Sequence, residues 1–473
     1  MAIPSSGPLS MTTIQTEFGG SNPIGLNEYY AGGGLVPAGT SGTYGAVPSS
    51  GAIGIQSFYG TSNVSGWYYF MAPSAGNGPR VRGMQPISNG NLLGTMNVGN
   101  SNYAFALNTT GAVVSCTVVS TYGLFIGFMN EGNAHAFAND NIPMFYKFDT
   151  KGIARLATDA TLIQPITWSV NQGDDLYLGG SSPSTYQAYY NRANLFNSEY
   201  GYYYQNWVML DFANNTAVTK YYAQQGQDNY WGRFLDGMSL TDSTWSYALV
   251  SWSGSPSGSG LMKFNKTTGA LDGSNGFHIG GMAGAFGFVS DPSGNMYISA
   301  QTGGRIARIN SSITAVNWCN GYSESGATGS DTYIAYYDGY LYAVQDQRSS
   351  TGTLLMKLNP SNGSVVWSVR INNTFLLRVD GISVTANGIV VSGRNNAATP
   401  YGVILNYPIA GGLFGSFNSG VLVITSVTAS ASAVSSTITN PGYPSFTTDT
   451  SSRGTTNGNT LNATSFPYSR STY

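Results

Sequence analysis

Residues 356–366 read Met356-Lys-Leu-Asn359-Pro-Ser-Asn-Gly363-Ser-Val-Val, in which two short apolar runs flank a polar turn. Asn and Gly adopt the backbone conformations that a tight turn requires, so this stretch predicts a β-hairpin. Related stretches recur along the chain. Their anchoring polar residues are Asn108, Asp149, Asn214, Asn265, Asn310, Asn359 and Asn406.

The spacing of these hairpins predicts the fold. Successive anchors are separated by 41, 65, 51, 45, 49 and 47 residues. Propeller blades recur at about 40–50 residues with four strands each. We therefore expect an all-β chain with a β-propeller of about seven blades over residues 63–425, six or eight being the neighbouring possibilities. A β-sandwich array or a β-helix is the alternative, although a β-helix favours shorter and more uniform periods.

Two tryptophans support the repeat. Trp318 and Trp367 both follow the turn of their hairpin at nearly the same distance. A residue that keeps its phase in successive repeats is typical of a structural position in a blade. We expect both tryptophans to occupy the same structural position in neighbouring blades.

Composition excludes several classes of function. Only 8% of the 473 residues are charged, against roughly 25% in ordinary soluble domains, and the net charge is −2. No Lys or Arg precedes Arg80, and no basic stripe follows, so we expect no nucleic-acid partner. No segment has the pattern of a secretory signal or the length of apolar sequence that spans a bilayer, so we expect no membrane insertion.

The sequence holds two cysteines, Cys116 and Cys319. They are far apart in the chain, and the pattern favours two buried free thiols over a disulfide. With synthesis in a cytoplasm, free thiols are the expected state.

Residues 1–62 carry a different repeat. Ile3-Pro4-Ser-Ser-Gly-Pro-Leu-Ser-Met is echoed by Val47-Pro48-Ser-Ser-Gly-Ala-Ile-Gly-Ile, and the copies lead to Phe18-Gly19 and Phe58-Tyr59-Gly60. Ser10 is positioned to cap a short helix over residues 11–18. We expect this segment to be too small for a core of its own and to dock onto another protein or onto its own copies. The predicted assembly residues are Pro4, Phe18, Pro48, Phe58 and Tyr59.

The Pro-Ser-Ser-Gly-x-Ile stretch with its aromatic-Tyr-Gly ending resembles an N-terminal module of tail-fibre and other virion structural proteins of tailed bacteriophages, marine ones especially. It covers about 60 residues of this chain, and Gly54 stands where that module commonly has Ser. The resemblance implies a virion location in the tail or a surface appendage. It also implies attachment through the N-terminus to tail or baseplate proteins, with a homo-oligomer expected and the distal domain facing outward.

Aromatic residues gather where the hairpin spacing is widest, over residues 186–235. Long loops on a rigid scaffold commonly bind ligands, and Tyr and Trp interleaved with Asn, Gln and Asp suit sugar rings or a protein partner. The alternative is that these rings pack the segment onto a neighbouring blade or subunit. The predicted binding residues are Tyr189, Tyr190, Tyr202, Tyr203, Trp207, Tyr230 and Trp231.

The sequence contains few residues of the types that commonly act in catalysis. His135 and His278 are the only histidines, and no nucleophile, phosphate-loop or metal motif appears, so we expect no enzyme activity, no cofactor and no metal. The alternative is a glycan-degrading tail spike, which needs two carboxylates roughly 5–9.5 Å apart. A purely architectural propeller is a third reading. The acidic residues near the aromatic segment are Asp174, Asp175, Glu199, Asp211, Asp228, Asp236 and Asp242.

The last segment, residues 426–473, is rich in Ser, Thr and Asn with scattered aromatic residues. A flexible tail and an extended segment lying on a surface both fit this composition. Aromatic residues such as Tyr443 and Phe466 suggest the extended segment, and the composition leaves both arrangements open.

Overall fold

The fold was analysed in a computed structural model of the chain. It describes residues 3–31, 33, 35–36, 40–61, 66–71, 80–86, 91–98, 101–120, 124–131, 134–140, 150–157, 162–169, 175–180, 185–192, 202–211, 216–225, 234–235, 245–252, 258–265, 277–282, 284–300, 302–324, 327–328, 331–347, 352–395, 401–417, 420–439, 447–452, 455–456 and 470–472.

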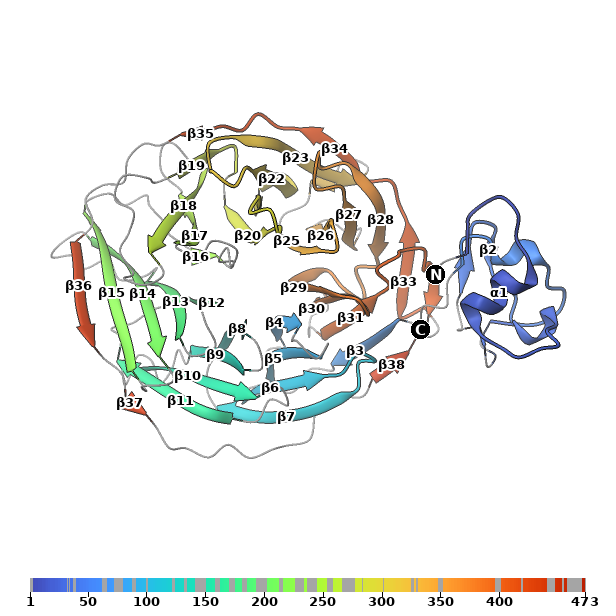
Figure 1. Cartoon of the computed structure of the whole chain (residues 1–473), viewed down its shortest axis with the longest axis horizontal. Coiled ribbons are helices and arrows are strands. Elements are labelled where there is room, and N and C mark those ends of the chain that lie inside the picture. The colour runs from blue at the N-terminus through green and yellow to red at the C-terminus, as the bar shows by residue number, and fades with distance from the viewer. Residues whose placement is uncertain are drawn as a thin grey trace.

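Seven antiparallel sheets of the described strands stand around a common axis, as Figure 1 shows. Their innermost strands contact one another in a closed ring. Each sheet is built on four strands in radial order from the axis outward. The chain is therefore all-β and forms a β-propeller, and its seven blades agree with the hairpin spacing.

Blades 1 to 4 each take four consecutive strands. Blade 1 has β4 (Arg80–Pro86), β5 (Leu92–Val98), β6 (Ser101–Leu107) and β7 (Val113–Ser120). Blade 2 has β8 (Leu124–Glu131), β9 (Ala134–Asp140), β10 (Thr150–Ala157) and β11 (Leu162–Ser169). Blade 3 has β12 (Asp175–Gly180), β13 (Thr185–Arg192), β14 (Tyr202–Asp211) and β15 (Thr216–Gln225). Blade 4 has β16 (Phe234–Leu235), β17 (Trp245–Trp252), β18 (Gly258–Asn265) and β19 (Phe277–Gly280).

Blades 5 and 6 are also built from consecutive strands, whereas blade 7 closes the ring by combining both ends of the propeller sequence. Blade 5 has β20 (Ala285–Ser290), β21 (Met296–Ala300), β22 (Arg305–Ile309) and β23 (Val316–Glu324), with η3 (Thr302–Gly304) and β24 (Ala327–Thr328) beside them. Blade 6 has β25 (Thr332–Tyr337), β26 (Tyr340–Gln347), β27 (Gly352–Leu358) and β28 (Val365–Ile371). Blade 7 has β29 (Arg378–Thr385), β30 (Gly388–Arg394), β31 (Gly402–Tyr407) and, from the other end of the chain, β3 (Trp67–Met71).

The recurring Asn marks the turn between the third and fourth strands of a blade. In blade 6 the Asn359 side-chain oxygen accepts hydrogen bonds from the backbone N–H (2.9 Å) and hydroxyl (2.7 Å) of Ser361. In blade 1 the Asn108 side chain accepts from the backbone N–H groups of Thr110 and Ala112. An Asn side chain that binds nearby backbone donors in this way favours a turn over a continuing strand. The hairpin prediction is therefore confirmed at these turns.

A tryptophan on the outer strand of one blade lies against the turn glycine of the next blade. At Gly363, which has φ +70°, an added Cβ would lie 2.8 Å from the Trp318 ring. The Trp318 indole N–H also donates to the Pro360 carbonyl at 2.9 Å. An added Cβ at Gly411 would likewise lie 3.1 Å from the Trp367 ring, although the Trp367 indole N–H has no acceptor among the described residues. The two tryptophans thus occupy equivalent blade positions, as their phase predicts, and we call each such Trp–Gly contact between neighbouring blades a latch.

The third latch closes the ring. Trp67 of β3 lies against Gly111 of the blade 1 turn, and Tyr69 donates a hydrogen bond to the Gly111 carbonyl at 2.7 Å. Tyr322 makes the matching bond to Gly363 at 2.6 Å. Blades 7 and 1 are therefore joined by the same chemistry as blades 5 and 6.

A basic residue two positions before the turn Asn lies between aromatic neighbours. Arg308 is the cross-strand partner of both Tyr297 and Trp318. In blade 6, Lys357 has Tyr342 and Trp367 as its partners. A cation over an aromatic ring gains about 0.5–1 kcal/mol at exposed sites. Some of the few charged residues of the chain therefore make contacts with aromatic side chains within blades.

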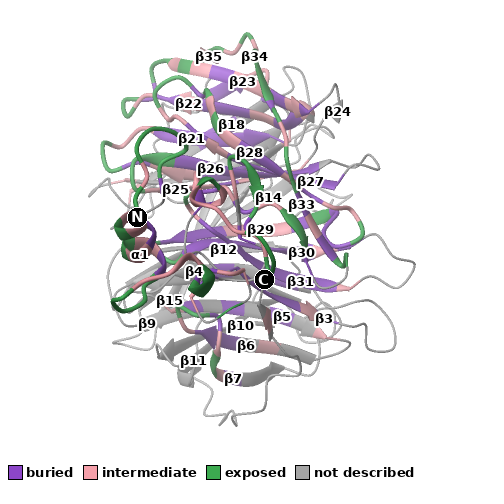
Figure 2. Cartoon of the chain, turned by 90° about the vertical axis from the view of Figure 1, so that its right-hand side faces the viewer, coloured by how far each residue is buried: buried purple, intermediate pink, exposed green. Residues whose placement is uncertain are grey.

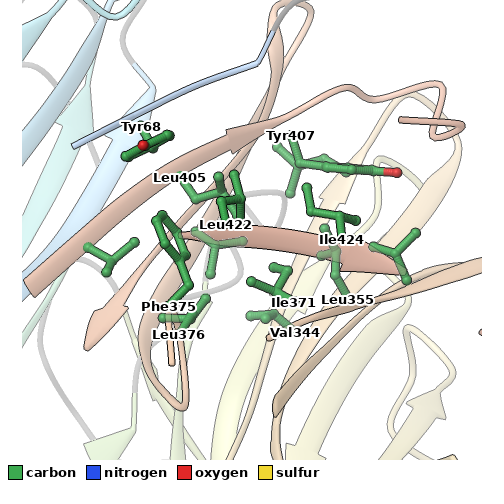
Figure 3. Packing of buried hydrophobic residues seen from close by; sticks show 14 of the residues in the cluster. Tyr68, Val344, Leu355, Ile371, Phe375, Leu376, Leu405, Tyr407, Leu422 and Ile424 are labelled. Carbon is green, nitrogen blue, oxygen red and sulfur yellow. The ribbon is translucent and has the colours of Figure 1, made fainter. Parts of the chain in front are cut away.

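Apolar side chains are buried between the blades. Figure 2 colours the buried residues purple along the strands. The cluster shared by blades 6 and 7 joins Leu355 and Ile371 to Leu405 and Tyr407. Figure 3 shows Leu422, from the segment after blade 7, packed among them. The core is thus a ring of interblade layers rather than one central mass.

The C-terminal segment runs around the outside of the ring. We call residues 422–472 the belt; its strands are β33 (Leu422–Ser426), β34 (Ser430–Ala433), β35 (Ile438–Thr439), β36 (Thr447–Ser452), β37 (Thr455–Thr456) and β38 (Arg470–Thr472). In that order they pair with the outer strands of blades 6, 5, 4, 3, 2 and 7. The belt therefore passes the blades in reverse chain order, along the rim in Figure 1.

The belt covers edges that the composition leaves unprotected. Natural sheets often protect an exposed edge with Lys or other charges, because unpaired backbone groups invite aggregation. Only 8% of this chain is charged, so a paired strand takes that role. Short β32 (Gly415–Phe417) extends the blade 6 sheet further through β33. The expected extended C-terminal segment is confirmed in its described parts, whereas Tyr443 and Phe466 lie outside the described residues.

Sequence spacing misplaces one feature. Much of the segment at 186–235, expected as a loop insertion, forms the regular strands β13, β14 and β15 of blade 3. Strands β14 and β15 have 10 residues each, against 5 to 8 in most other blade strands. The 65-residue gap also joins unlike positions, because Asp149 precedes β10, the third strand of blade 2, whereas Asn214 follows β14, the third strand of blade 3. Residues 193–201 and 226–233 of this segment lie outside the described residues.

Candidate functional site

The N-terminal module, residues 3–61, lies beside the propeller ring in Figure 1. It contains α1 (Met11–Phe18), η1 (Leu26–Glu28), η2 (Ile55–Phe58) and the two-stranded sheet of β1 (Ser41–Gly42) and β2 (Gly45–Ala46). The Ser10 side chain accepts a hydrogen bond from the Thr13 N–H at 3.2 Å. This cap satisfies a donor at the helix start and confirms the predicted helix.

The module has a small core of its own, which corrects the expectation that it is too short for one. Phe58 is fully buried, and its ring meets the edges of Phe18 and Tyr29 at centroid distances of 6.1 and 6.2 Å. Ile14 and Val47 complete the cluster with several smaller contacts. Three aromatic rings supply much apolar area in few residues, which is why so short a segment can close a core.

A second internal repeat organises the module, and the sequence interpretation above missed it. Residues 24–31 read Ile-Gly-Leu-Asn-Glu-Tyr-Tyr-Ala, and residues 53–60 read Ile-Gly-Ile-Gln-Ser-Phe-Tyr-Gly. In both copies an extended glycine, Gly25 or Gly54, precedes a 3-10 turn. The partner of Phe58-Tyr59 is therefore Tyr29-Tyr30 rather than Phe18-Gly19. The recurring Ile-Gly pair was the available signal.

Each half of the module braces the Pro-Ser-Ser-Gly turn of the other half. The Gly60 N–H donates to the Pro4 carbonyl at 3.0 Å, and the Tyr59 hydroxyl donates to the Gly7 carbonyl at 2.6 Å. In the other half, the Ala31 N–H donates to the Pro48 carbonyl at 3.0 Å. The Tyr30 hydroxyl likewise donates to the carbonyl of Gly51. The two turns are thus held by matching bonds at both ends.

The predicted assembly residues divide into two groups. Phe18 and Phe58 are buried and hold the module core together. Pro4 is exposed, and Pro48 and Tyr59 are half-buried, so these three reach the surface. The four serines of the two turns are exposed as well. Tyr44 is 68% exposed, and its ring meets that of Tyr59 at 5.8 Å.

This surface can bind through hydroxyl groups, backbone groups and aromatic rings. Glu17 and Glu28 are the only charged side chains in residues 3–61. Recognition here would depend little on ion pairs, because so few charges are present. The chemistry suits a specific protein contact in which Tyr side chains act as anchors.

The blade 3 strands hold five of the seven predicted binding residues. Tyr189 of β13 lies directly opposite Trp207 of β14. Tyr190 lies opposite Asn206 in the next register position. Tyr202 and Tyr203 are paired with Gln225 and Gln224 of β15. Tyr230 and Trp231 lie outside the described residues.

The outer edge of blade 3 is occupied. Residues Val218 to Ala223 of β15 pair with β36 of the belt, so Lys220 is the partner of Thr450. A ligand therefore does not add to this edge as another strand. Contact with the aromatic positions would come through the ends of the blade or the surfaces beside it.

Burial makes the Cys319 thiol unreactive. Desolvation raises the pKa of Cys319 to about 11, while Arg305 and the Ser436 hydroxyl act in the opposite direction. Cys116 is also buried and free. A protonated thiol is a poor nucleophile. The expected pair of buried free thiols is thus confirmed.

We expect neither thiol of the native protein to react with a thiol reagent at about pH 8. Both should react once the chain is unfolded in denaturant, and labelling followed by mass spectrometry would measure this. Because burial raises the pKa of the Cys319 thiol in the folded chain, its contribution to the free energy of unfolding is fully present below about pH 8.5, the ordinary pKa of a thiol. This contribution is lost as the pH rises through about 11, the pKa in the folded chain. Rapid labelling of Cys319 in the folded chain would contradict this burial.

The described part of the chain offers neither a metal site nor a membrane-spanning helix. There, no three His, Cys, Asp or Glu side chains are grouped so as to hold a metal ion. None of the helices described is long and apolar enough to cross a membrane.

Known proteins offer likeness in shape alone. No protein-family model matches the chain, and no curated protein matches it. Among solved structures, a Xanthomonas campestris gluconolactonase is 12% identical, with a TM-score of 0.34 over 59% of this chain and 92% of that one. Kluyveromyces lactis Hsv2 is 9% identical, with a TM-score of 0.30 over 62% and 94% of the two chains. The likeness is of fold alone.

A third similar structure is the AfRom2 CNH domain. It is 7% identical, with a TM-score of 0.35 over 72% of this chain and 99% of that domain. These low identities and scores carry no argument about activity.

Proposed function

We propose that this chain is a structural component of a tailed-bacteriophage particle, in a tail fibre, the baseplate or another appendage. The N-terminal module attaches it to other virion proteins, and the propeller presents a binding surface. The proposal rests on the sequence resemblance of the two Pro-Ser-Ser-Gly turns. It is supported by the small independent core that carries them.

The braced pair of turns is the observation that carries the proposal. Matching hydrogen bonds fix the Pro4 and Pro48 turns at carbonyl groups, while the serines between stay exposed. Fixed turns lose little conformational entropy when they bind, which favours tight docking. A duplicated contact in one module also suits a symmetric partner, such as a homo-oligomeric ring of the particle.

We propose that the propeller binds rather than catalyses. The aromatic positions of blade 3, with Tyr189 opposite Trp207, suit a host-surface glycan or a neighbouring virion protein. A rigid ring of blades holds these positions in fixed register. This binding role rests on the residue types and their register.

Mass spectrometry of purified particles tests the location. We expect peptides of this chain in particles that have been separated from lysate protein by density gradient. Their amount relative to the capsid protein should stay constant through a second gradient. Absence of the chain from particles, or its loss in the second gradient, would contradict the proposal.

Incubation of the purified chain with host surface polysaccharide tests binding against catalysis. We expect retention of the chain on the polysaccharide without release of reducing ends. Release of reducing ends in proportion to the amount of protein would replace the binding role with glycan hydrolysis.

A further inference from the structure

Two arginines face each other in blade 7. Arg378 is the first residue of β29, and it lies directly opposite Arg394, the last residue of β30. Like charges in opposed positions of an antiparallel pair are destabilising. The chain has 19 basic residues in 473, so two in register are notable for a sequence that uses charge so sparingly.

The register places this pair beside blade 1. Arg394 is also the cross-strand partner of Gly402, which pairs with Met71 of β3. Met71 is fully buried in the cluster shared by blades 7 and 1. Cross-strand partners lie on the same face of a sheet, so both arginines belong to the face that packs on blade 1. The pair thus stands at the end of an interblade layer.

Neither guanidinium forms an ion pair within the part of the chain that is described, where the one ion pair joins Arg370 to Glu324. Arg378 is exposed and Arg394 half-buried. The Arg394 Nε atom is buried without a hydrogen-bond acceptor. A buried donor left unsatisfied costs about 1–3 kcal/mol, and more when charged. The Arg308 Nε atom is buried without an acceptor as well, so the like-charged register partner is what sets Arg394 apart. Asp380, two residues after Arg378, is the one acidic residue of β29.

The backbone around the pair is fixed. The Leu377 N–H donates to the Arg394 carbonyl at 3.0 Å. The Asn395 side chain accepts from the Tyr401 N–H at 2.8 Å and donates to the Thr374 carbonyl at 3.2 Å. The two arginines are therefore held on ordered strands and braced loops, which is the arrangement expected of a preformed site.

We propose that Arg378 and Arg394 together bind an oxyanion group, such as the sulfate, phosphate or carboxylate of an acidic saccharide. Guanidinium groups match the geometry of these anions through paired N–H donors. The anion cancels the repulsion between the two arginines and supplies an acceptor to Arg394. This site is separate from the aromatic positions of blade 3, and it stands whether or not the chain is a virion component.

Isothermal titration calorimetry on the full chain at low ionic strength tests the site. The probes are inorganic sulfate, inorganic phosphate, a sulfated oligosaccharide and its unsulfated counterpart. We expect binding of the charged probes, weakened about tenfold in Arg378→Gln and in Arg394→Gln. Arg308→Gln in blade 5 is the matched control, because Arg308 has aromatic cross-strand partners, and it should keep the affinity of the parent chain.

The two sources of the anion give different results. Binding of inorganic anions alone assigns the site to a free anion, whereas tighter binding of the sulfated oligosaccharide assigns it to a saccharide group. Equal binding of sulfated and unsulfated sugar would overturn the proposal. Unchanged affinity in the Arg378→Gln, Arg394→Gln double variant would overturn it too, as would no binding of any charged probe.

Melting temperatures show whether the variants are folded. Without an anion, Arg378→Gln should melt no lower than the parent chain, because it removes like-charge repulsion. A lower melting temperature would mean that Arg378 serves stability and would contradict the assigned role.

Discussion

A chain truncated after Ser426 is expected to lose about 3–4 kcal/mol of stability and to self-associate. The truncation keeps β33, with its buried Leu422 and Ile424, and removes β34 to β38. The outer strands of blades 5, 4, 3, 2 and 7 then lose their paired neighbour. Ala429 and Val434 also leave the apolar layers that they help to cover. Denaturant unfolding and size-exclusion chromatography would measure both effects.

Thiol labelling gives this experiment an internal reporter. The Val434 N–H donates to the Cys319 carbonyl at 2.8 Å, so the belt lies directly over that residue. Truncation should make Cys319 react with a thiol reagent, while Cys116 in blade 1, where no described belt strand pairs, stays protected. A truncated chain that remains monomeric, equally stable and unreactive at Cys319 would contradict a structural role for the belt.

Replacing Gly111 by alanine is expected to cost about 2–4 kcal/mol and to weaken ring closure. Gly111 has φ +80°, and an added Cβ would overlap the Trp67 ring. Its carbonyl also accepts the Tyr69 hydrogen bond, so any shift of the turn strains a second contact. Equilibrium unfolding in guanidinium would give the change in the free energy of unfolding.

Gly339→Ala is the matched control for the closing latch. Gly339 has φ +76°, and an added Cβ there would meet nothing within 4 Å. Alanine at this position should therefore cost only about 1 kcal/mol, from backbone strain alone. Equal losses in the two variants would mean that the contact with Trp67 adds nothing to stability.

Local sequence patterns predicted the local structure well. The capped helix over Met11–Phe18 follows from Ser10, and the blade turns follow from Asn108 and Asn359. These features depend on hydrogen bonds between residues a few positions apart. Periodicity then extends them to a ring of about seven blades, because each blade repeats the same turn.

Such local patterns do not predict which strands pair when they are far apart in the sequence. The Ser436 hydroxyl donates to the Gly280 carbonyl across 156 positions of sequence, and β3 closes blade 7 from the opposite end of the propeller. Strand β34, Ser-Ala-Ser-Ala, has no large apolar residue to mark it as a strand, and all four of its residues are exposed. Its structure comes from the edge to which it pairs.

The candidate sites were predicted unevenly for the same reason. Pro4 and Pro48 were identified from their motif, and both lie at braced turns of the module. The blade 3 aromatics were identified as a cluster, but their place on strands depends on strand length, which the turn spacing alone does not give. The opposition of Arg378 and Arg394 needs the register of β29 and β30, so composition could not suggest it.

Incorporation into particles tests the central claim, that the N-terminal module attaches the propeller to the virion. Three tagged chains would be supplied in trans during phage growth: the full chain, residues 63–473, and the full chain with Phe58→Ala, which removes the ring at the centre of the module core. Quantitative mass spectrometry of purified particles would measure the tag, and melting curves would show that the propeller of each is folded. We predict that only the full chain is incorporated. Incorporation of residues 63–473 at the level of the full chain would contradict the account.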